Sequence, residues 1–310
     1  MGAIRLTDVT KTFGRHTAVD GLSLSVPRGS VYGFIGPNGS GKTTTLRMIL
    51  HIIFPDRGQI EVLGHTDARA ANDRIGYLPE ERGLYKKMTL RRQLLYWGEL
   101  KGMRASEARR AGDAWLEKLG LSSWGDKKIE TLSKGMSQKV QFISAVIASP
   151  ELVILDEPFT GLDPVNMEVL RGAILELHRG GTSVIFSTHD MAIAEQMCDF
   201  IFMIYKGRKV LDGTLDSIKE GYGADTVRLQ LEGGRGALEG FPGIESVIDQ
   251  GRFQDVRLRS GDAQQLLRYL TGKTAVHHFE RMRPTLHDIF IRIAGPGARE
   301  VLEQRGGERG

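Results

Sequence analysis

Apolar and polar positions alternate near the start of the chain. Three apolar residues are separated by two serines, in the order Leu22, Ser23, Leu24, Ser25, Val26. Because successive side chains of a strand point to opposite faces, this period of two is typical of a strand with one buried face. The segment Ile4 to Pro27 is therefore predicted to form antiparallel strands.

Longer apolar runs follow. Val31–Ile35, Leu152–Leu155 and Val184–Phe186 are bounded by polar residues, as strands of a parallel sheet buried on both faces are. Between about Met88 and Gly120, apolar positions instead recur at helical spacing among many charged residues. This order of elements predicts an α/β domain over residues 1–220, with a helical subdomain at about 86–150.

A different pattern begins near residues 221–223. Short alternating strands surround one helix, and a last helix begins at Thr285, with Asp288 completing a capping box. This pattern predicts a small α+β domain at residues 223–295. The residues from 296 to 310 are rich in Gly, Arg and Glu and are predicted to be disordered.

Composition narrows the class of protein. The chain has 310 residues, of which 40% are hydrophobic and 26% charged, as in an ordinary globular protein. The net charge of +4 comes from charges that alternate in sign along the chain, which favours solvated helix faces over a nucleic-acid surface. Attraction to an anionic membrane surface stays open as an alternative. The single cysteine, Cys198, fits a reducing compartment, and the longest apolar runs are only strand-sized.

The pattern G-x-x-x-x-G-K-[ST] occupies residues 36–43, between an apolar run and a helix-forming one. Its glycines let several backbone N–H groups converge at the start of a helix, where an anion is stabilised. Lys42 adds a cation for the β- and γ-phosphates, and Thr43 offers a hydroxyl to Mg²⁺. We predict that a nucleoside triphosphate is bound by Gly36, Pro37, Asn38, Gly39, Ser40, Gly41, Lys42, Thr43 and Thr44.

Polar side chains end two of the predicted buried strands. Asp156 and Glu157 follow one strand, and His189 closely follows the other. Ligands of open α/β sheets lie at the carboxyl ends of strands, so Asp156 is predicted to be a second-sphere carboxylate of the Mg²⁺ site and Glu157 to polarise the attacking water. The alternative is that the acidic pair merely ends its strand and that His189 is structural. Because both strands should point at one phosphate, we take Lys42, Glu157 and His189 as the candidate catalytic residues.

Leu132–Gln138 precede a helix-like stretch, Lys139–Ala148. Ser133 and Gly135 can offer a hydroxyl and backbone N–H groups to an anion. From the residues alone, an ordinary helix N-cap is the favoured interpretation.

Together these motifs resemble, in full order, those of the ATP-binding subunit of ABC transporters, over about residues 2–220. In this resemblance, residues 36–43 are the Walker A loop, Asp156 ends the Walker B strand, and Leu132–Met136 are the signature. Thr160–Asp163 match the D-loop, which makes Asp163 a candidate nucleotide contact, and His189 matches the switch histidine. Phe13 matches the aromatic residue that stacks on adenine.

The resemblance implies a fold and two cofactors. The expected fold class is α/β, an ABC-type P-loop ATPase core with an antiparallel β subdomain and a helical subdomain, followed by the small C-terminal α+β domain. The implied cofactors are ATP and Mg²⁺, with Thr43, Glu80 and Asp156 as candidate metal ligands.

The chain departs from the family pattern at three positions. Lys134 and Met136 replace the usual Gly and Gln of the signature, and Glu80 stands at the Q-loop position, where Gln is typical. With the C-terminal Pro284–Phe290 segment, these variants resemble the sodium- and drug-export branch, whose ATPases work with separately encoded membrane permeases.

The family also implies partners. Two ATP-binding subunits, here expected to be identical, would close head to tail on two ATPs, with Ser133 and Gly135 contacting the nucleotide of the other subunit. The expected location is peripheral, on the cytoplasmic face of the membrane, with no nucleic-acid partner.

Two other classes of protein compete with this interpretation. The main alternative is a soluble ABC ATPase that acts on nucleic acid or ribosomes, but the chain has one P-loop and no room for a long coiled coil before the signature. A GTP-binding switch is disfavoured because the Asn-Lys-x-Asp guanine motif is missing from the sequence.

Overall fold

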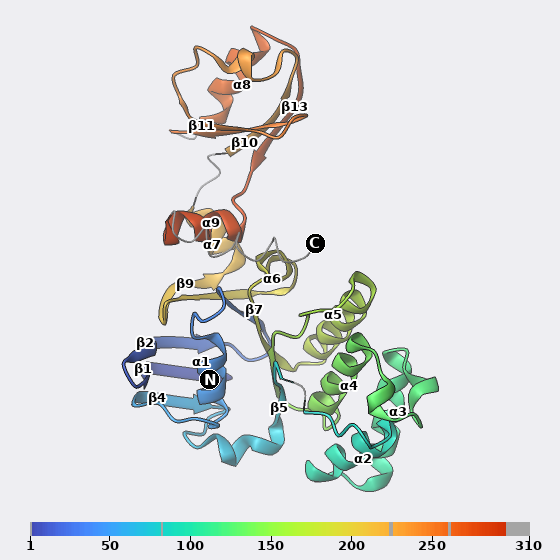
Figure 1. The fold of residues 1–310 in the computed structure, drawn as a ribbon. Coiled ribbons are helices and arrows are strands. Elements are labelled where there is room, and N and C mark those ends of the chain that lie inside the picture. The colour runs from blue at the N-terminus through green and yellow to red at the C-terminus, as the bar shows by residue number, and fades with distance from the viewer. Residues whose placement is uncertain (1, 82, 223–225, 260–261, 296–310) are drawn as a thin grey trace. The chain divides into compact units, whose positions relative to one another are not determined.

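A computed structural model describes residues 2–81, 83–222, 226–259 and 262–295 of the chain (Figure 1). The chain divides into two compact units, Met1–Thr214 and Leu215–Gly310. The tail predicted to be disordered, residues 296–310, lies outside the described residues.

The first unit opens with a three-stranded antiparallel sheet in the order β2-β1-β4. Its strands are β1 (Ile4–Phe13), β2 (His16–Val26) and β4 (Arg57–Val62). The alternation predicted for β2 is confirmed, because Leu22, Leu24 and Val26 are buried whereas Ser23 and Ser25 are exposed. One face of this part of β2 is therefore buried, as the period of two requires.

A six-stranded sheet forms the centre of this unit, in the order β5-β6-β7-β3-β8-β9. All neighbouring pairs run parallel except β8 and β9. The strands are β3 (Val31–Ile35), β5 (Ile75–Leu78), β6 (Leu152–Asp156), β7 (Ser183–Thr188), β8 (Phe200–Tyr205) and β9 (Arg208–Thr214). Because β3, β6 and β7 are parallel neighbours, their carboxyl ends open on the same edge of the sheet.

One apolar core joins the two sheets of this unit. It contains Val19 and Leu22 of the small sheet, Phe34 and Phe202 of the central sheet, and Leu46 of the helix that follows β3, all fully buried. Burial of aromatic side chains of this size is a large favourable term in folding, so the core fixes β3 relative to the small sheet.

The first unit also contains six α-helices among the described residues (Figure 1). They are α1 (Lys42–Ile49), α2 (Leu90–Leu100), α3 (Ala105–Lys118), α4 (Lys134–Val146), α5 (Pro164–Arg179) and α6 (Met191–Met197), with short 3₁₀ turns η1 (Ala68–Arg74), η2 (Ser122–Trp124) and η3 (Ile129–Thr131). The helical spacing after Met88 is confirmed by α2 and α3.

The second unit contains a four-stranded antiparallel sheet in the order β11-β12-β10-β13, together with three α-helices and one 3₁₀ turn among the described residues. Its elements are α7 (Leu215–Gly221), β10 (Thr226–Leu231), η4 (Gly234–Leu238), β11 (Ile244–Asp249), β12 (Gln254–Leu258), α8 (Ala263–Thr271), β13 (Val276–Met282) and α9 (Leu286–Ala294). The predicted capping box is confirmed, since Thr285 and Asp288 bond reciprocally at the start of α9.

The fold class predicted from the sequence is confirmed, including the antiparallel sheet, the helices and the α+β C-terminal unit. Within the described ranges, none of the helices is both long and apolar enough to cross a membrane.

We expect a chain that ends at Thr214 to fold and to bind nucleotide. The core of the first unit and the core around β10 and α8 share no residue, so each unit has its own apolar interior. Circular dichroism and ATP titration by calorimetry would check this. An insoluble fragment, or one without ATP affinity, would contradict it.

Candidate functional site

The loop after β3 is packed tightly against neighbouring backbone. A Cβ atom on Gly36 would lie 2.2 Å from the carbonyl oxygen of Ile204, and one on Gly41 would lie 2.5 Å from that of Ala18. Gly41 also has a φ of 109°, which side chains rarely adopt. The loop therefore requires glycine at both positions. Lys42 then begins α1, which directs the positive end of a helix dipole towards the loop.

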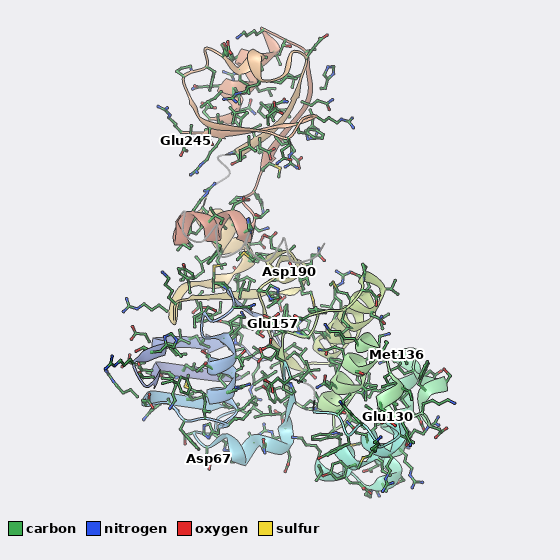
Figure 2. All side chains as sticks on the ribbon, viewed as in Figure 1. Asp67, Glu130, Met136, Glu157, Asp190 and Glu245 are labelled. Atoms are coloured by element: carbon green, nitrogen blue, oxygen red, sulfur yellow. The ribbon has the colours of Figure 1, made fainter. Side chains whose placement is uncertain are left out.

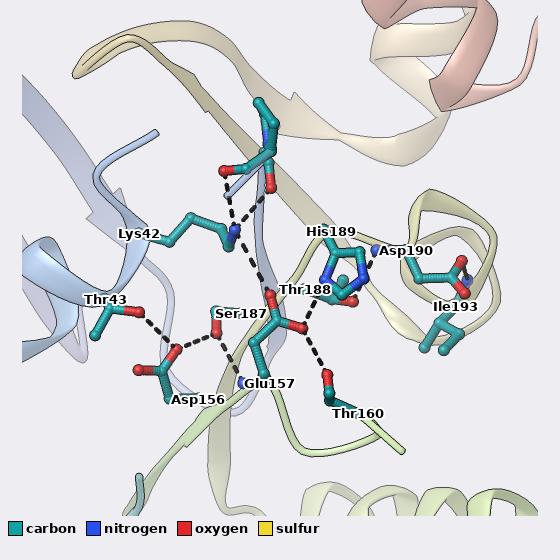
Figure 3. Close-up of polar contacts among 12 residues, drawn as sticks. Lys42, Thr43, Asp156, Glu157, Thr160, Ser187, Thr188, His189, Asp190 and Ile193 are labelled. Atoms are coloured by element: carbon teal, nitrogen blue, oxygen red, sulfur yellow. Dashed lines mark hydrogen bonds and ion pairs between the residues drawn. The ribbon is translucent and has the colours of Figure 1, made fainter. Parts of the chain in front are cut away.

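Lys42 is a buried cation in this loop. Its Nζ donates hydrogen bonds to the carbonyl oxygens of Gly36 and Pro37, at 2.7 and 3.2 Å, and lies 3.6 Å from Glu157 Oε1. Burial lowers the pKa of Lys42, and the nearby carboxylates of Glu157 and Asp156 oppose that shift. The ammonium is thus held at the point where the loop and the acidic pair meet (Figure 3).

Asp156 lies at the end of β6, fully buried, opposite Ser187 of β7. Its Oδ1 accepts hydrogen bonds from Ser187 Oγ at 2.5 Å and from Thr43 Oγ1 at 3.3 Å. Its Oδ2 is buried and has no hydrogen-bond partner among the described residues. Burial raises the pKa of Asp156. A buried carboxylate oxygen without a donor, next to a hydroxyl, is a suitable ligand set for a hard cation.

Glu157 follows at once, in a left-handed backbone conformation with a φ of 50°. Its N–H donates to Ser187 Oγ at 2.9 Å, and its Oε2 lies 3.0 Å from His189 Nδ1 and accepts from Thr160 Oγ1 at 3.2 Å. Its Oε1 faces Lys42. The carboxylate is therefore held by Thr160, His189 and Lys42 (Figure 3). The left-handed backbone conformation at Glu157 costs about 1–3 kcal/mol for a residue other than glycine.

A cavity of about 460 Å³ opens beside these groups. Its lining residues are Phe13, His16, Ala18, Asn38, Gly39, Gly41, Lys42, Thr43, Thr44, Glu80 and Glu157. Phe13 is half exposed, so one ring face is accessible at the rim. A volume of this size, with a cation and backbone N–H groups at one end and an aromatic ring at another, suits a nucleotide.

The remaining predicted residues of the loop and of the acidic pair adjoin this cavity. Gly36 and Pro37 bind Lys42 through their carbonyls, and Ser40 is buried within the loop. Asp156 and His189 reach the lining residues Thr43 and Glu157 by hydrogen bonds.

Ser133, Gly135 and Asp163 are not brought to this cavity in the described part of the chain. Ser133 caps α4, and its Oγ accepts from Met136 N–H at 3.2 Å. Asp163 caps α5 by accepting from Asn166 N–H at 3.0 Å. Figure 2 places Met136, in the first turn of α4, well away from Glu157.

One element boundary was predicted wrongly. The helix expected at Lys139 begins at Lys134, because the Ser133 cap satisfies a backbone donor of its first turn. Lys134, Gly135 and Met136 of the signature are therefore part of the helix, and Ser133 is its N-cap.

Sequence reasoning assigned no role to four residues at the site. His16 and Ala18 line the cavity because β2 lies beside the loop of residues 36–43. No sequence motif predicts that contact. Ser187 and Thr160 hold Asp156 and Glu157. Their signal was available, since Ser187 directly follows the apolar run Val184–Phe186 and Thr160 lies three residues after Glu157.

The His189–Glu157 pair should make stability depend on pH. The hydrogen bond to Glu157 raises the pKa of His189, and partial burial acts in the opposite direction. The stabilisation is fully present below the ordinary histidine pKa of about 6.5 and is lost as pH rises through the higher folded value. We expect His189→Gln to lower the melting temperature more at about pH 6 than at about pH 9. Thermal unfolding with His277→Gln as control would check this, and an equal loss at both pH values would contradict it.

Comparisons with known proteins agree with this geometry. Residues 19–160 match the family model described as ABC transporter, and residues 213–294 match the model for the C-terminal domain of ATP-binding protein DrrA1-3-like. The uncharacterized ABC transporter ATP-binding protein YhaQ of Bacillus subtilis is 42% identical over 293 residues, covering 94% of this chain and 98% of the relative. The Nod factor export ATP-binding protein I of Sinorhizobium fredii is 34% identical over 94% of this chain and 86% of its own.

A solved structure, that of an ATP-binding subunit of an ABC transporter, superposes with a TM-score of 0.66 and 30% identity over 71% of this chain and 93% of its own. The resemblance inferred from the motifs and from the C-terminal segment is thereby confirmed. The chain belongs to the nucleotide-binding ATPases of ABC transporters, with a C-terminal domain of the DrrA type.

Proposed function

We propose that this chain binds and hydrolyses ATP as one subunit of an export system, and that its closure as a dimer drives a separately encoded membrane permease. The observation that carries the proposal is the hydrogen-bonded network of Thr43, Asp156, Ser187, Glu157 and His189 beside the loop of Lys42, in which Asp156, Ser187 and Glu157 are buried. Such a network provides a cation ligand and a base at the end of a phosphate-binding cavity.

Mg²⁺ fits the residues at this point. Thr43 and Asp156 would hold it, because Asp156 Oδ2 is buried without a donor and Thr43 Oγ1 lies 3.3 Å from Asp156 Oδ1. The described residues include no cluster of three or more His, Cys, Asp or Glu side chains that could hold a metal alone. Phosphate oxygens and water would complete the ligand set. When bound, Mg²⁺ supplies positive charge to the β- and γ-phosphates.

Lys42, Glu157 and His189 have different roles in the proposed reaction. Lys42 exchanges its two backbone carbonyl partners for phosphate oxygens. Glu157 accepts a proton from the attacking water, because its carboxylate is held rigidly by Thr160 and His189 at the edge of the cavity. His189 orients Glu157 and donates from its ring towards the reacting phosphate.

The signature and D-loop residues are assigned to the second subunit's nucleotide. Ser133 and Asp163 are exposed and lie away from their own cavity, so a contact in trans gives them a partner. Val165, two residues past Asp163, is an apolar side chain that is 74% exposed, which fits an interface. We propose a homodimer in head-to-tail arrangement.

The export assignment rests on the relatives and on the C-terminal domain. One relative is named for Nod factor export, and the match over residues 213–294 is to a DrrA-type domain. These similarities favour an export ATPase over the competing class, a soluble ABC ATPase that acts on nucleic acid or ribosomes. An export ATPase would bind peripherally to the cytoplasmic face of the membrane.

The proposal is tested by expressing the chain with a candidate membrane permease from a neighbouring reading frame. We expect the two proteins to purify together in detergent and the ATPase rate to depend on the membrane partner. Binding to ribosomes or nucleic acid instead, with ATPase activity stimulated by them, would favour the competing class.

A separate prediction concerns Glu80, the residue at the Q-loop position. Its carboxylate lines the cavity with Thr43 and Glu157, which places an added negative charge near the proposed metal and the phosphates. We propose that Glu80 engages the site only when Mg²⁺ is bound. Glu80→Gln should keep hydrolysis within about tenfold, roughly 1.4 kcal/mol of barrier, and should weaken the dependence of dimer closure on Mg²⁺.

The measurement is ATP-driven dimerisation titrated with Mg²⁺. Glu81→Gln is the matched control, because Glu81 is the exposed neighbour that does not line the cavity. Superimposable titration curves for the wild type and Glu80→Gln would contradict the prediction.

A further inference from the structure

A buried glutamine connects the signature helix to the backbone beside Glu157. Gln138 lies in the second turn of α4, and only 6% of its surface is exposed. Its Nε2 donates a hydrogen bond of 3.1 Å to the carbonyl oxygen of Pro158. Pro158 immediately follows Glu157, so this bond ends one residue from the proposed base.

The backbone at that point needs external support. Glu157 has a φ of 50°, and a residue with a side chain keeps such a conformation only where its surroundings hold it. On one side Ser187 Oγ accepts from Glu157 N–H. On the other side Pro158 has no N–H to donate, and its carbonyl is held by Gln138. The turn that presents Glu157 is thus fixed between β7 and α4.

The helix that supplies this support is largely buried, and its first turn contains Lys134–Met136 of the signature. Its residues from Ser137 to Ile143 are buried, and Ser133 caps its first turn. The same helix also packs closely against the start of α5, because a Cβ atom built on Gly135 would lie 3.0 Å from Asn166 Nδ2. A displacement of the signature therefore moves Gln138, and with it the segment that follows Glu157.

We infer that Gln138 is a positioning residue for hydrolysis, which holds Glu157 in place and makes its position depend on that of the signature helix. This inference rests on the proposed role of Glu157 as the general base. Gln138 does not line the cavity in the described chain, so it acts through Glu157 rather than on the nucleotide.

The test compares Gln138→Leu with Gln141→Leu in the full-length chain. Gln141 is the matched control because it is a glutamine of the same helix, also 6% exposed, whose Nε2 donates instead to the carbonyl oxygen of Glu81 at 3.4 Å. We expect Gln138→Leu to lower kcat about 10- to 100-fold with ATP affinity and KM within about threefold of wild type, because a small displacement of a reacting group has a cost of this order. Gln141→Leu should keep kcat within about threefold, even where both variants lose similar thermal stability.

A double variant separates positioning from a general loss of structure. If Gln138 acts through Glu157, adding Gln138→Leu to Glu157→Gln should leave the residual rate within about twofold of Glu157→Gln alone. An additive loss, or equal kcat values for Gln138→Leu and Gln141→Leu, would overturn the inference while the role of Glu157 stands. Wild-type hydrolysis by Glu157→Gln would overturn the proposed base, and the inference with it.

Discussion

Glu157→Gln is expected to bind ATP with wild-type affinity and to lose hydrolysis by about 10²- to 10⁴-fold, the usual contribution of a positioned general base. An amide of the same shape can still accept from Thr160, so the turn at Glu157 should persist. It cannot accept the proton of the attacking water. The variant should therefore accumulate as a closed dimer when ATP is added.

Calorimetry of ATP binding, phosphate release and size-exclusion chromatography with ATP would measure the three effects. Glu151→Gln is a suitable control, because that carboxylate lies at the surface and pairs with Arg74. Phosphate release at the wild-type rate by Glu157→Gln would show that another group accepts the proton.

Lys42→Ala is expected to weaken nucleotide binding itself. Hydrogen bonds to charged groups contribute about 1.5–3 kcal/mol each, so the loss of one phosphate contact should reduce ATP affinity by at least about tenfold. The substitution also removes the cation that lies 3.6 Å from Glu157, so the two adjacent buried carboxylates lose that positive charge. A lower melting temperature should accompany the weaker binding.

Lys139→Ala separates these two effects. Lys139 is also buried, but its Nζ donates to the carbonyl oxygen of Leu119, away from the cavity. That variant should lose stability and keep its ATP affinity. Calorimetry and thermal unfolding of both variants would check this, and unchanged ATP affinity of Lys42→Ala would contradict the assignment of Lys42 to phosphate.

Much of the candidate site follows from local patterns. The loop at residues 36–43 was predicted as a unit because its glycine positions reflect backbone conformation, and Gly41 has the left-handed φ that this requires. Asp156 could be placed at a strand end because the preceding residues form one apolar run. The start of α4 was missed because the signature's polar residues give no apolar period, although Ser133 caps the helix.

The amino-acid sequence by itself determined most helices and strands, the phosphate loop, the acidic pair and the family. Each of these depends on the spacing of residues that are close together in the chain. Only the tertiary structure decided which groups form contacts. Ser187 bonds to Asp156, 31 residues away, and Gln138 bonds to the backbone carbonyl of Pro158, 20 residues away. These contacts depend on the order of strands in the sheet and on the helix packed against it. Strand order and helix packing are set by burial of the whole core, which no local pattern encodes.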